Sequence, residues 1–268
     1  MFDSDPYRLG LGTYSLTGEA GIDAMVAAIE AGYRHLDTAT LYGNEEEVGA
    51  AIERASVDRD ELFVATKIAH KEEPGSTPEY VRTGVDESRE KLGCDTIDLL
   101  YHHWPGGPED VETVLPVLEA LADEGTVERV AVSNYPIRYV ERAQELVDAP
   151  LFANQVEMHP LLQQDELYEY LREQDMYAVA YSPLAQGKVF DVPELQDIAE
   201  KHDTTPAHVS LAWLRSRDGV VPIPRSSSED HIRANFEARD LTLDDEDRAR
   251  IADIDETHRC EDPDWMEW

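Results

Sequence analysis

The sequence of 268 residues is poor in positive charge. It has 23 Lys and Arg residues against 58 Asp and Glu residues, which gives a formal net charge of −35. Proteins hold nucleic-acid phosphates and anionic lipid headgroups with basic patches. We therefore expect no nucleic acid and no membrane surface among the partners of this protein.

Cysteine and long apolar runs are also scarce. Cys94 and Cys260 are too few for a disulfide scaffold or a zinc site, and we predict no metal. No apolar run approaches the roughly 18 residues that a membrane span needs. The first 20 residues lack a basic region followed by an apolar stretch, which argues against a signal peptide. These absences predict a cytoplasmic protein.

Lysine is the rarest charged residue. It occurs only at Lys67, Lys71, Lys91, Lys188 and Lys201. A large net charge destabilises a compact chain by self-repulsion, and about 1 M salt shortens the Debye length to roughly 3 Å. The composition resembles that of proteins from salt-accumulating halophiles and favours a halophilic, haloarchaeal protein over an ordinary acidic one.

Short apolar runs with strand character recur along the chain. Eight of them are candidate strands, at residues 9–12, 34–37, 62–67, 97–101, 129–132, 152–156, 177–181 and 220–223. Strand and helix thus alternate about eight times, which is typical of an α/β fold of the (β/α)8 TIM-barrel type, with a doubly wound sheet as the alternative. No Pro/Gly/Ser-rich linker divides the chain, so we predict one domain over residues 1–268.

The segments between these runs have the features of helices. Residues 22–29 carry apolar side chains at helical spacing before Gly32, and Thr77 is an N-cap for a helix that ends at Gly93. The apolar stripe over 114–121 predicts a helix that begins near Thr113, because Pro116 is tolerated only in a first turn. Further helices are expected to start near Pro136, Asp165, Val192, Pro206 and Ser228.

Polar and aromatic side chains stand at or just past the ends of the predicted strands. They are Asp37, Lys67, His103, Ser133, Asn134, Gln155, Tyr181, Arg225 and Ser226. In such barrels the chemistry lies at the carboxyl ends of the strands. The pattern therefore predicts an active site at one mouth of the barrel.

Asp37, Tyr42, Lys67 and His103 form the candidate catalytic set. The Lys67 ammonium is expected to lower the pKa of Tyr42, Asp37 to hold the lysine charged, and His103 to donate to a carbonyl oxygen where negative charge develops. Each residue alone has a structural alternative: a buried ion pair, a helix cap or a packed histidine. Together they predict that Tyr42 protonates a carbonyl oxygen while hydride arrives from a cofactor.

These motifs resemble those of the aldo-keto reductase superfamily, in its prokaryotic form, over nearly the whole chain. The similar segments are 10–14, 33–45, 66–67, 97–105, 132–135, 154–160, 180–184 and 223–226. The resemblance implies the same catalytic set. Two histidines, His102 and His103, are adjacent in this motif. Their positions relative to Asp98 and Trp104 match the family motif when His103 is the catalytic histidine, and His102 then stands where the family has an aliphatic residue. His159 is expected to be structural.

The resemblance also implies a nicotinamide cofactor. Ser133, Asn134 and Gln155 would bind its carboxamide, and Tyr181 would stack on its ring. The full expected set is Thr13, Ser133, Asn134, Gln155, Tyr181, Ser182, Leu184, Arg225, Ser226 and Asn235. Arg225 replaces the usual lysine and favours NADP (NADPH) through its 2′-phosphate. His231 and Ala234 depart from the family pattern, so NAD stays an alternative.

Other positions bear on the substrate. Tyr14 and Trp104 are expected to line its site, Ala69 to widen the pocket, and the tail 260–268 to touch the rim or pack on the barrel. The sequence thus predicts a monomeric NADP-dependent carbonyl reductase that acts reversibly on a small aldehyde or ketone. The alternative is a nicotinamide-binding, redox-sensing regulatory subunit without significant turnover.

Overall fold

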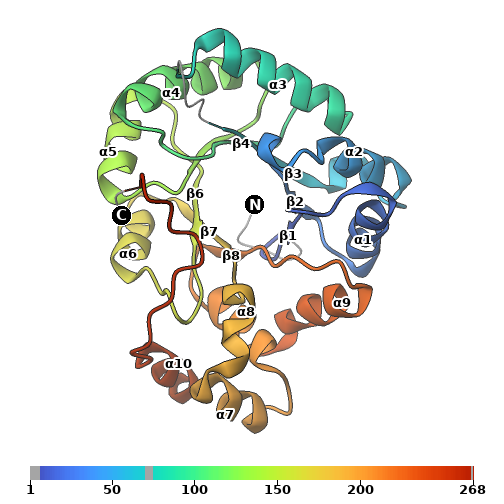
Figure 1. Ribbon diagram of the computed structural model, residues 1–268, viewed down its shortest axis with the longest axis vertical. Helices are drawn as coiled ribbons and strands as arrows, with labels where there is room; N and C mark the ends of the chain where they lie inside the picture. The colour runs from blue at the N-terminus through green and yellow to red at the C-terminus, as the bar shows by residue number, and fades with distance from the viewer. Residues whose placement is uncertain (1–6, 70–74, 267) are drawn as a thin grey trace.

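The computed structural model describes residues 7–69, 75–266 and 268, and its eight parallel strands follow one another in chain order around a closed barrel (Figure 1). The strands are β1 (Leu11–Gly12), β2 (His35–Asp37), β3 (Phe63–Ile68), β4 (Leu99–His102), β5 (Val130–Ser133), β6 (Ala153–Glu157), β7 (Tyr177–Tyr181) and β8 (Val220–Pro222). The Gly10 and Gly12 amides donate to the carbonyls of Pro222 and Pro224, at 3.0 and 3.1 Å, which joins β1 to β8. This closure confirms the predicted barrel over a doubly wound sheet.

Helices surround the barrel on its outside (Figure 1). They are α1 (Gly18–Ala31), α2 (Glu45–Arg54), α3 (Pro78–Leu92), α4 (Pro108–Asp123), α5 (Ile137–Leu146), α6 (Asp165–Glu173), α7 (Pro193–Lys201), α8 (Pro206–Ser216), α9 (Glu229–Glu237) and α10 (Asp245–Ala252), with short 3-10 turns at Thr40–Tyr42, Arg59–Glu61, Ala185–Asp191 and Ala238–Asp240. Residues 1–6, part of the segment that argued against a signal peptide, lie outside the described residues. Across the residues with assigned structure, no helix is both long and apolar enough to cross a bilayer.

Helix ends follow the predicted capping residues. The Thr77 side chain accepts from the Tyr80 amide at 3.2 Å, and Pro78 occupies the first turn of α3. Gly32 and Gly93 end α1 and α3 with φ angles of 114° and 66°, in the left-handed region that favours glycine. The local sequence thus sets the lengths of the helices that carry the loops of the mouth.

The predicted start of the fourth helix was wrong. α4 begins at Pro108, not near Thr113, and holds Pro116 in its interior. Proline removes the hydrogen bond to the carbonyl four residues earlier, here that of Glu112. Both Glu112 and Pro116 are exposed, so water can bind that carbonyl, while Val111 and Val114 in the first turns are buried. Core packing of those turns outweighs the lost bond.

Alternation along β3 places the predicted lysine inside the barrel. Phe63 and Ala65 belong to the apolar cluster of the barrel interior, whereas Val64 and Ile68 pack in the clusters between strands and helices. Side chains two residues apart share a face of a strand. Lys67 therefore follows Ala65 on the inner face, and its side chain is fully buried.

Candidate active site

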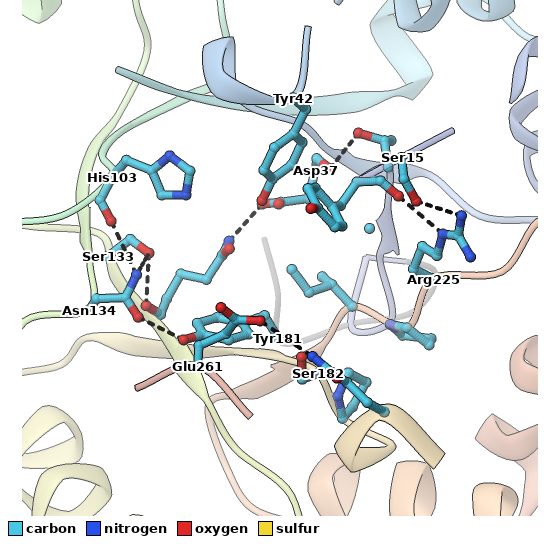
Figure 2. Close-up of a pocket in the computed structure, with 18 of the residues that line it drawn as sticks. Ser15, Asp37, Tyr42, His103, Ser133, Asn134, Tyr181, Ser182, Arg225 and Glu261 are labelled. Atoms are coloured by element: carbon cyan, nitrogen blue, oxygen red, sulfur yellow. Dashed lines mark hydrogen bonds between the residues drawn. The ribbon is translucent and has the colours of Figure 1, made fainter. Parts of the chain in front are cut away.

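A cavity of about 620 Å³ lies at the carboxyl ends of the strands. Of the predicted site residues, it is lined by Thr13, Tyr14, Asp37, Tyr42, His103, Trp104, Ser133, Asn134, Gln155, Tyr181, Ser182, Leu184 and Arg225. Figure 2 shows Tyr42 and His103 on one side of this cavity and Tyr181 with Glu261 on the other. Parallel strands of a barrel end at the same mouth, so residues far apart in sequence meet there.

A buried ion pair forms the base of the site. The Lys67 ammonium donates to Asp37 Oδ1 at 2.5 Å and to the carbonyl of Thr38 at 2.6 Å, and both charged side chains are almost fully buried. Gln155 Nε2 donates to the other Asp37 oxygen at 2.7 Å. A buried carboxylate with both oxygens satisfied is held in one orientation. This set of bonds fixes where the lysine charge lies.

Tyr42 lies directly beside this pair. The Lys67 nitrogen is 5.1 Å from the centre of the Tyr42 ring, and 5.6 Å from that of Tyr101. Tyr42 ends a 3-10 turn, Thr40–Tyr42, which Gly43 closes with a φ of 63°. The turn is tied to β3, because Thr40 Oγ1 donates to the Lys67 carbonyl at 2.9 Å. The tyrosine and the lysine are therefore positioned by the same strand end.

The acid–base properties of this group differ in part from the prediction. Burial raises the pKa of Tyr42 above its ordinary value, and the nearby Lys67 ammonium offsets this only in part. Burial alone would lower the pKa of Lys67, but Asp37 and Tyr42 raise it. Lys67 lowers the pKa of Tyr42 as expected, but desolvation of the phenolate raises that pKa by more. Tyr42 is consequently a protonated phenol next to a permanent cation.

His103 and two aromatic residues complete the pocket above Tyr42. The ring centres of His103 and Tyr42 are 5.9 Å apart, and those of Tyr14 and Tyr42 are 5.2 Å apart, both edge to face. The Trp104 ring contacts Trp265 and Trp268, with centres 5.3 and 6.0 Å away. The tail therefore touches the rim, one of the two arrangements that the sequence left open.

The predicted carboxamide-binding residues form one network on the opposite wall. Asn134 Nδ2 donates to Ser133 Oγ and to the His103 carbonyl, both at 3.2 Å, and Asn134 Oδ1 accepts from the Tyr181 hydroxyl at 2.9 Å. Ser133 Oγ donates to the Gln155 carbonyl at 3.0 Å. Thr13 Oγ1 donates to the Asp37 carbonyl at 3.0 Å. The network joins the ends of β5, β6 and β7 around a partly exposed tyrosine ring.

Backbone strain is concentrated at the same cavity. Eight non-glycine residues of the described chain have positive φ, and four of them line it: Ser15, Asn134, Ser182 and Gln186. Such conformations cost about 1–3 kcal/mol each and persist at sites where other contacts enforce them. The clustering is independent support for a functional site here.

Arg225 occupies one end of the cavity (Figure 2). Its Nε donates to the Tyr14 carbonyl at 3.0 Å and its Nη2 to Ser15 Oγ at 2.6 Å, and among the described residues no carboxylate pairs with it. Ser226 and Asn235, although nearly buried, do not line the cavity. Ala69 is likewise buried away from it.

Seven lining residues were not among the predicted site residues. Four lie within the motifs of the family resemblance, namely Gly12, Pro183, Ile223 and Pro224, and three lie outside them, namely Ser15, Gln186 and Glu261. Ser15 follows the first-strand motif directly, and Gln186 lies two residues past Leu184, so proximity to those motifs was a usable signal. Glu261 comes from the tail, where no periodic pattern indicates which side chain faces inward.

Glu157, His159 and Cys260 are a group of metal-ligand types within 4.8 Å of one another. Glu157 accepts from His159 Nε2 at 2.9 Å and from the amides of Cys260 and Glu261 at 2.6 and 2.8 Å. Burial and the Glu157 carboxylate raise the pKa of the Cys260 thiol to about 12. Hydrogen bonds to the tail account for this cluster, and the position of His159 agrees with its predicted structural role.

His102 faces the helix layer rather than the cavity. Its Nδ1 lies 2.6 Å from the Tyr135 hydroxyl, and its Nε2 lies 2.9 Å from Asp110 on α4. Asp110 in turn accepts from the Ser76 amide at 3.2 Å. His102 thus links β4 to α4 and to the loop before α3, while its neighbour His103 lines the site.

The fold and the polar mouth define a (β/α)8 barrel with a candidate active site at the carboxyl ends of its strands, and comparison with known proteins assigns the family. The profile of the Aldo/keto reductase family matches residues 8–256. The chain is 37% identical over 262 residues to the methylglyoxal reductase DkgA of Escherichia coli (strain K12), covering 96% of this chain and 93% of that protein. The glyoxal reductase of Bacillus subtilis (strain 168) is 36% identical over 251 residues, 93% of this chain and 89% of that protein.

Solved structures agree with this assignment. MGS-M4, an aldo-keto reductase from a Medee basin deep-sea metagenome library, superposes with a TM-score of 0.92 at 33% identity, covering 99% of this chain and 97% of that one. The protein belongs to the aldo/keto reductase family. Members of this family reduce carbonyl groups and generally use NAD(P)H.

Proposed function

We propose that this protein is an NADPH-dependent carbonyl reductase in which Tyr42 is the general acid. The observation that carries the proposal is the buried Asp37–Lys67 pair beside Tyr42 and His103 at one mouth. The raised pKa of Tyr42 keeps its phenol protonated, as a proton donor requires. The fixed Lys67 charge stabilises the phenolate that remains once the proton has been transferred.

The remaining lining residues support the rest of the assignment. His103 faces the position where a carbonyl oxygen would accept a proton from Tyr42, and there it would stabilise developing negative charge. The Ser133–Asn134–Tyr181 wall fits a flat amide-bearing ring, and Arg225 without an acidic partner fits a phosphate. The bound cofactor would supply the hydride to the carbonyl carbon. We keep Ser226 and Asn235 as cofactor residues that act beyond the end of the cavity.

Tyr42→Phe tests the proposal. It should reduce turnover of an aldehyde by about 10²–10⁴-fold, because general acid catalysis contributes that much. NADPH binding, measured by protein fluorescence, should stay within a few-fold. Tyr139→Phe on α5 is the control, because this residue does not line the cavity. Unchanged turnover in Tyr42→Phe would disprove the role of Tyr42.

The regulatory-subunit alternative predicts cofactor binding without turnover by the natural chain. The acid, its cation and the neighbouring histidine in one pocket favour turnover. The names of the relatives make methylglyoxal and glyoxal the first substrates to test.

We further propose that the chain works as one monomeric domain in a salt-rich cytoplasm, on the basis of its charge of −35 and its free cysteines. Activity and circular dichroism from low to molar KCl test the salt adaptation.

A further inference from the structure

A buried carboxylate is one of the groups that fix the C-terminal tail to the barrel. After α10 the chain runs back across the ends of β7 and β6 (Figure 1). Glu157, the last residue of β6, accepts from the amides of Cys260 and Glu261 and from His159. Hydrogen bonds to a carboxylate are roughly twice as strong as neutral ones. Two consecutive tail residues are therefore held in place at the mouth.

This anchor sets the position of the Glu261 side chain. Glu261 lines the cavity beside Tyr181 (Figure 2). Its Oε1 accepts from Gln186 Nε2 at 3.3 Å, so the loop after β7 holds it from the second side. Burial at the rim and the nearby Glu157 charge raise the pKa of the Glu261 carboxyl above its ordinary value.

The charges that line the cavity are unequally compensated. Asp37 is neutralised by Lys67 at 2.5 Å. Arg225 lies at the end of the cavity assigned to the cofactor phosphate. Glu261 has no cationic partner among the residues that the structure describes. Glu261 is exposed to solvent, but it lines a concave cavity, and a cleft focuses the field of a charge more strongly than an open surface does.

We propose that Glu261 is a specificity-determining residue that selects neutral or cationic carbonyl compounds over compounds that carry a carboxylate or phosphate. The proposal rests on the proposed function, since it takes the carbonyl to bind between Tyr42 and His103. A charged group elsewhere on such a substrate must then share the cavity with Glu261. The repulsion is expected to lower kcat/KM for an anionic substrate by roughly five- to tenfold in dilute buffer.

A matched pair of aldehydes tests this selection. Terephthalaldehydic acid carries a carboxylate, and its methyl ester has nearly the same shape without the charge. With saturating NADPH in dilute buffer, Glu261→Gln should raise kcat/KM for the acid by about five- to tenfold and change that for the ester less than about twofold. Asp264→Asn is the control, because this tail residue is exposed like Glu261 but does not line the cavity. In molar KCl the difference between Glu261→Gln and the natural chain should shrink.

The outcomes separate this proposal from the proposed function. Equal gains for acid and ester, a lower KM for NADPH in Glu261→Gln, or no change for either aldehyde would overturn the selection. If the natural chain reduces neither of these aldehydes and also fails to reduce methylglyoxal and glyoxal, the proposed function fails, and the selection is then tested by binding alone. Quenching of tryptophan fluorescence, with Trp104 in the cavity wall, should then show tighter binding of the acid but not of the ester in Glu261→Gln. Equal binding of the acid by both proteins would overturn the selection.

Discussion

Charges on the outer helices and charges at the barrel mouth are organised in opposite ways. On the outside, ion pairs such as Arg82–Glu124 and Arg142–Glu112 leave about 40–50% of each side chain exposed, amid a large excess of acid. At the mouth, Lys67 and Asp37 are almost fully buried, and hydrogen bonds from Gln155 and to Thr38 fix them. Exposed charges are screened by salt, whereas buried pairs are screened far less.

The outer helices and the barrel mouth therefore place different requirements on their charged residues. The shell can accumulate acidic residues because each one is individually replaceable and solvated. The mouth needs its few cations at defined atoms, and the chain keeps Lys67 paired with the lining residue Asp37 and Arg225 in the lining itself, although lysine is otherwise scarce. Salt should therefore act on the stability of the shell and leave the geometry of the site intact.

Removing the buried cation should have the largest effect. Lys67→Met keeps the length of the side chain but leaves Asp37 as a buried carboxylate without its ion partner. We expect turnover to fall by about 10²–10⁴-fold and the free energy of unfolding by about 3–5 kcal/mol. Urea denaturation and steady-state kinetics measure the two effects.

A double variant serves as the control for this prediction. Asp37→Asn with Lys67→Met removes both charges, so most of the stability should return while turnover stays low. If Lys67→Met were as stable as the natural chain, the pair would be no more important for stability than the surface pairs. The contrast between mouth and shell would then disappear.

Much of the mouth was predictable because it depends on local sequence. Phe63 and Ala65 alternate into the barrel, so Lys67 two residues later had to follow them. Thr77 and Gly93 set the length of α3 through backbone geometry alone. Periodicity and capping are properties of neighbouring residues, and they carry over directly into three dimensions.

The rest depends on contacts between distant segments. Gln155 donates to Asp37 across 118 positions of sequence, which no spacing indicates. Glu261 is held at the cavity by bonds from the tail backbone to Glu157, and backbone contacts leave no mark on the side-chain pattern. Packing between distant segments also decides where α4 begins. Two turns of α4 before Pro116 are helical because they pack on the core, although a proline inside a helix disfavours them.

Weakening the tail anchor should have an intermediate effect. Burial alone would raise the pKa of Glu157, but His159 and the amides of Cys260 and Glu261 hold it below its ordinary value. A lowered folded-state pKa contributes stability above the unfolded pKa, and this contribution is lost as the pH falls through the folded value. Glu157→Gln should lower the free energy of unfolding by about 1.5–3 kcal/mol at neutral pH.

The pH profile of the Tm distinguishes this charge from others. The loss of stability in acid, below the ordinary value of 4.5, should be shallower in Glu157→Gln than in the natural chain. Glu53→Gln, an exposed substitution on α2, removes the same charge and should leave the profile unchanged. Parallel acid profiles for Glu157→Gln and the natural chain would refute the anchoring role of the carboxylate.

The smallest effect is expected at the surface pair Arg82–Glu124, although its geometry is good. Two hydrogen bonds, of 2.8 and 2.9 Å, join the guanidinium to the carboxylate. Arg82→Gln makes the net charge more negative, and Glu124→Gln makes it less negative. Because self-repulsion destabilises the folded chain, in dilute buffer the Tm should fall further in the arginine variant than in the glutamate variant. In molar KCl both shifts, and their coupling in a double-mutant cycle, should fall below detection, because solvent and salt screen exposed charges. A coupling that persists in molar KCl would mean that this pair behaves like Asp37–Lys67, and burial would then no longer explain why the mouth resists salt.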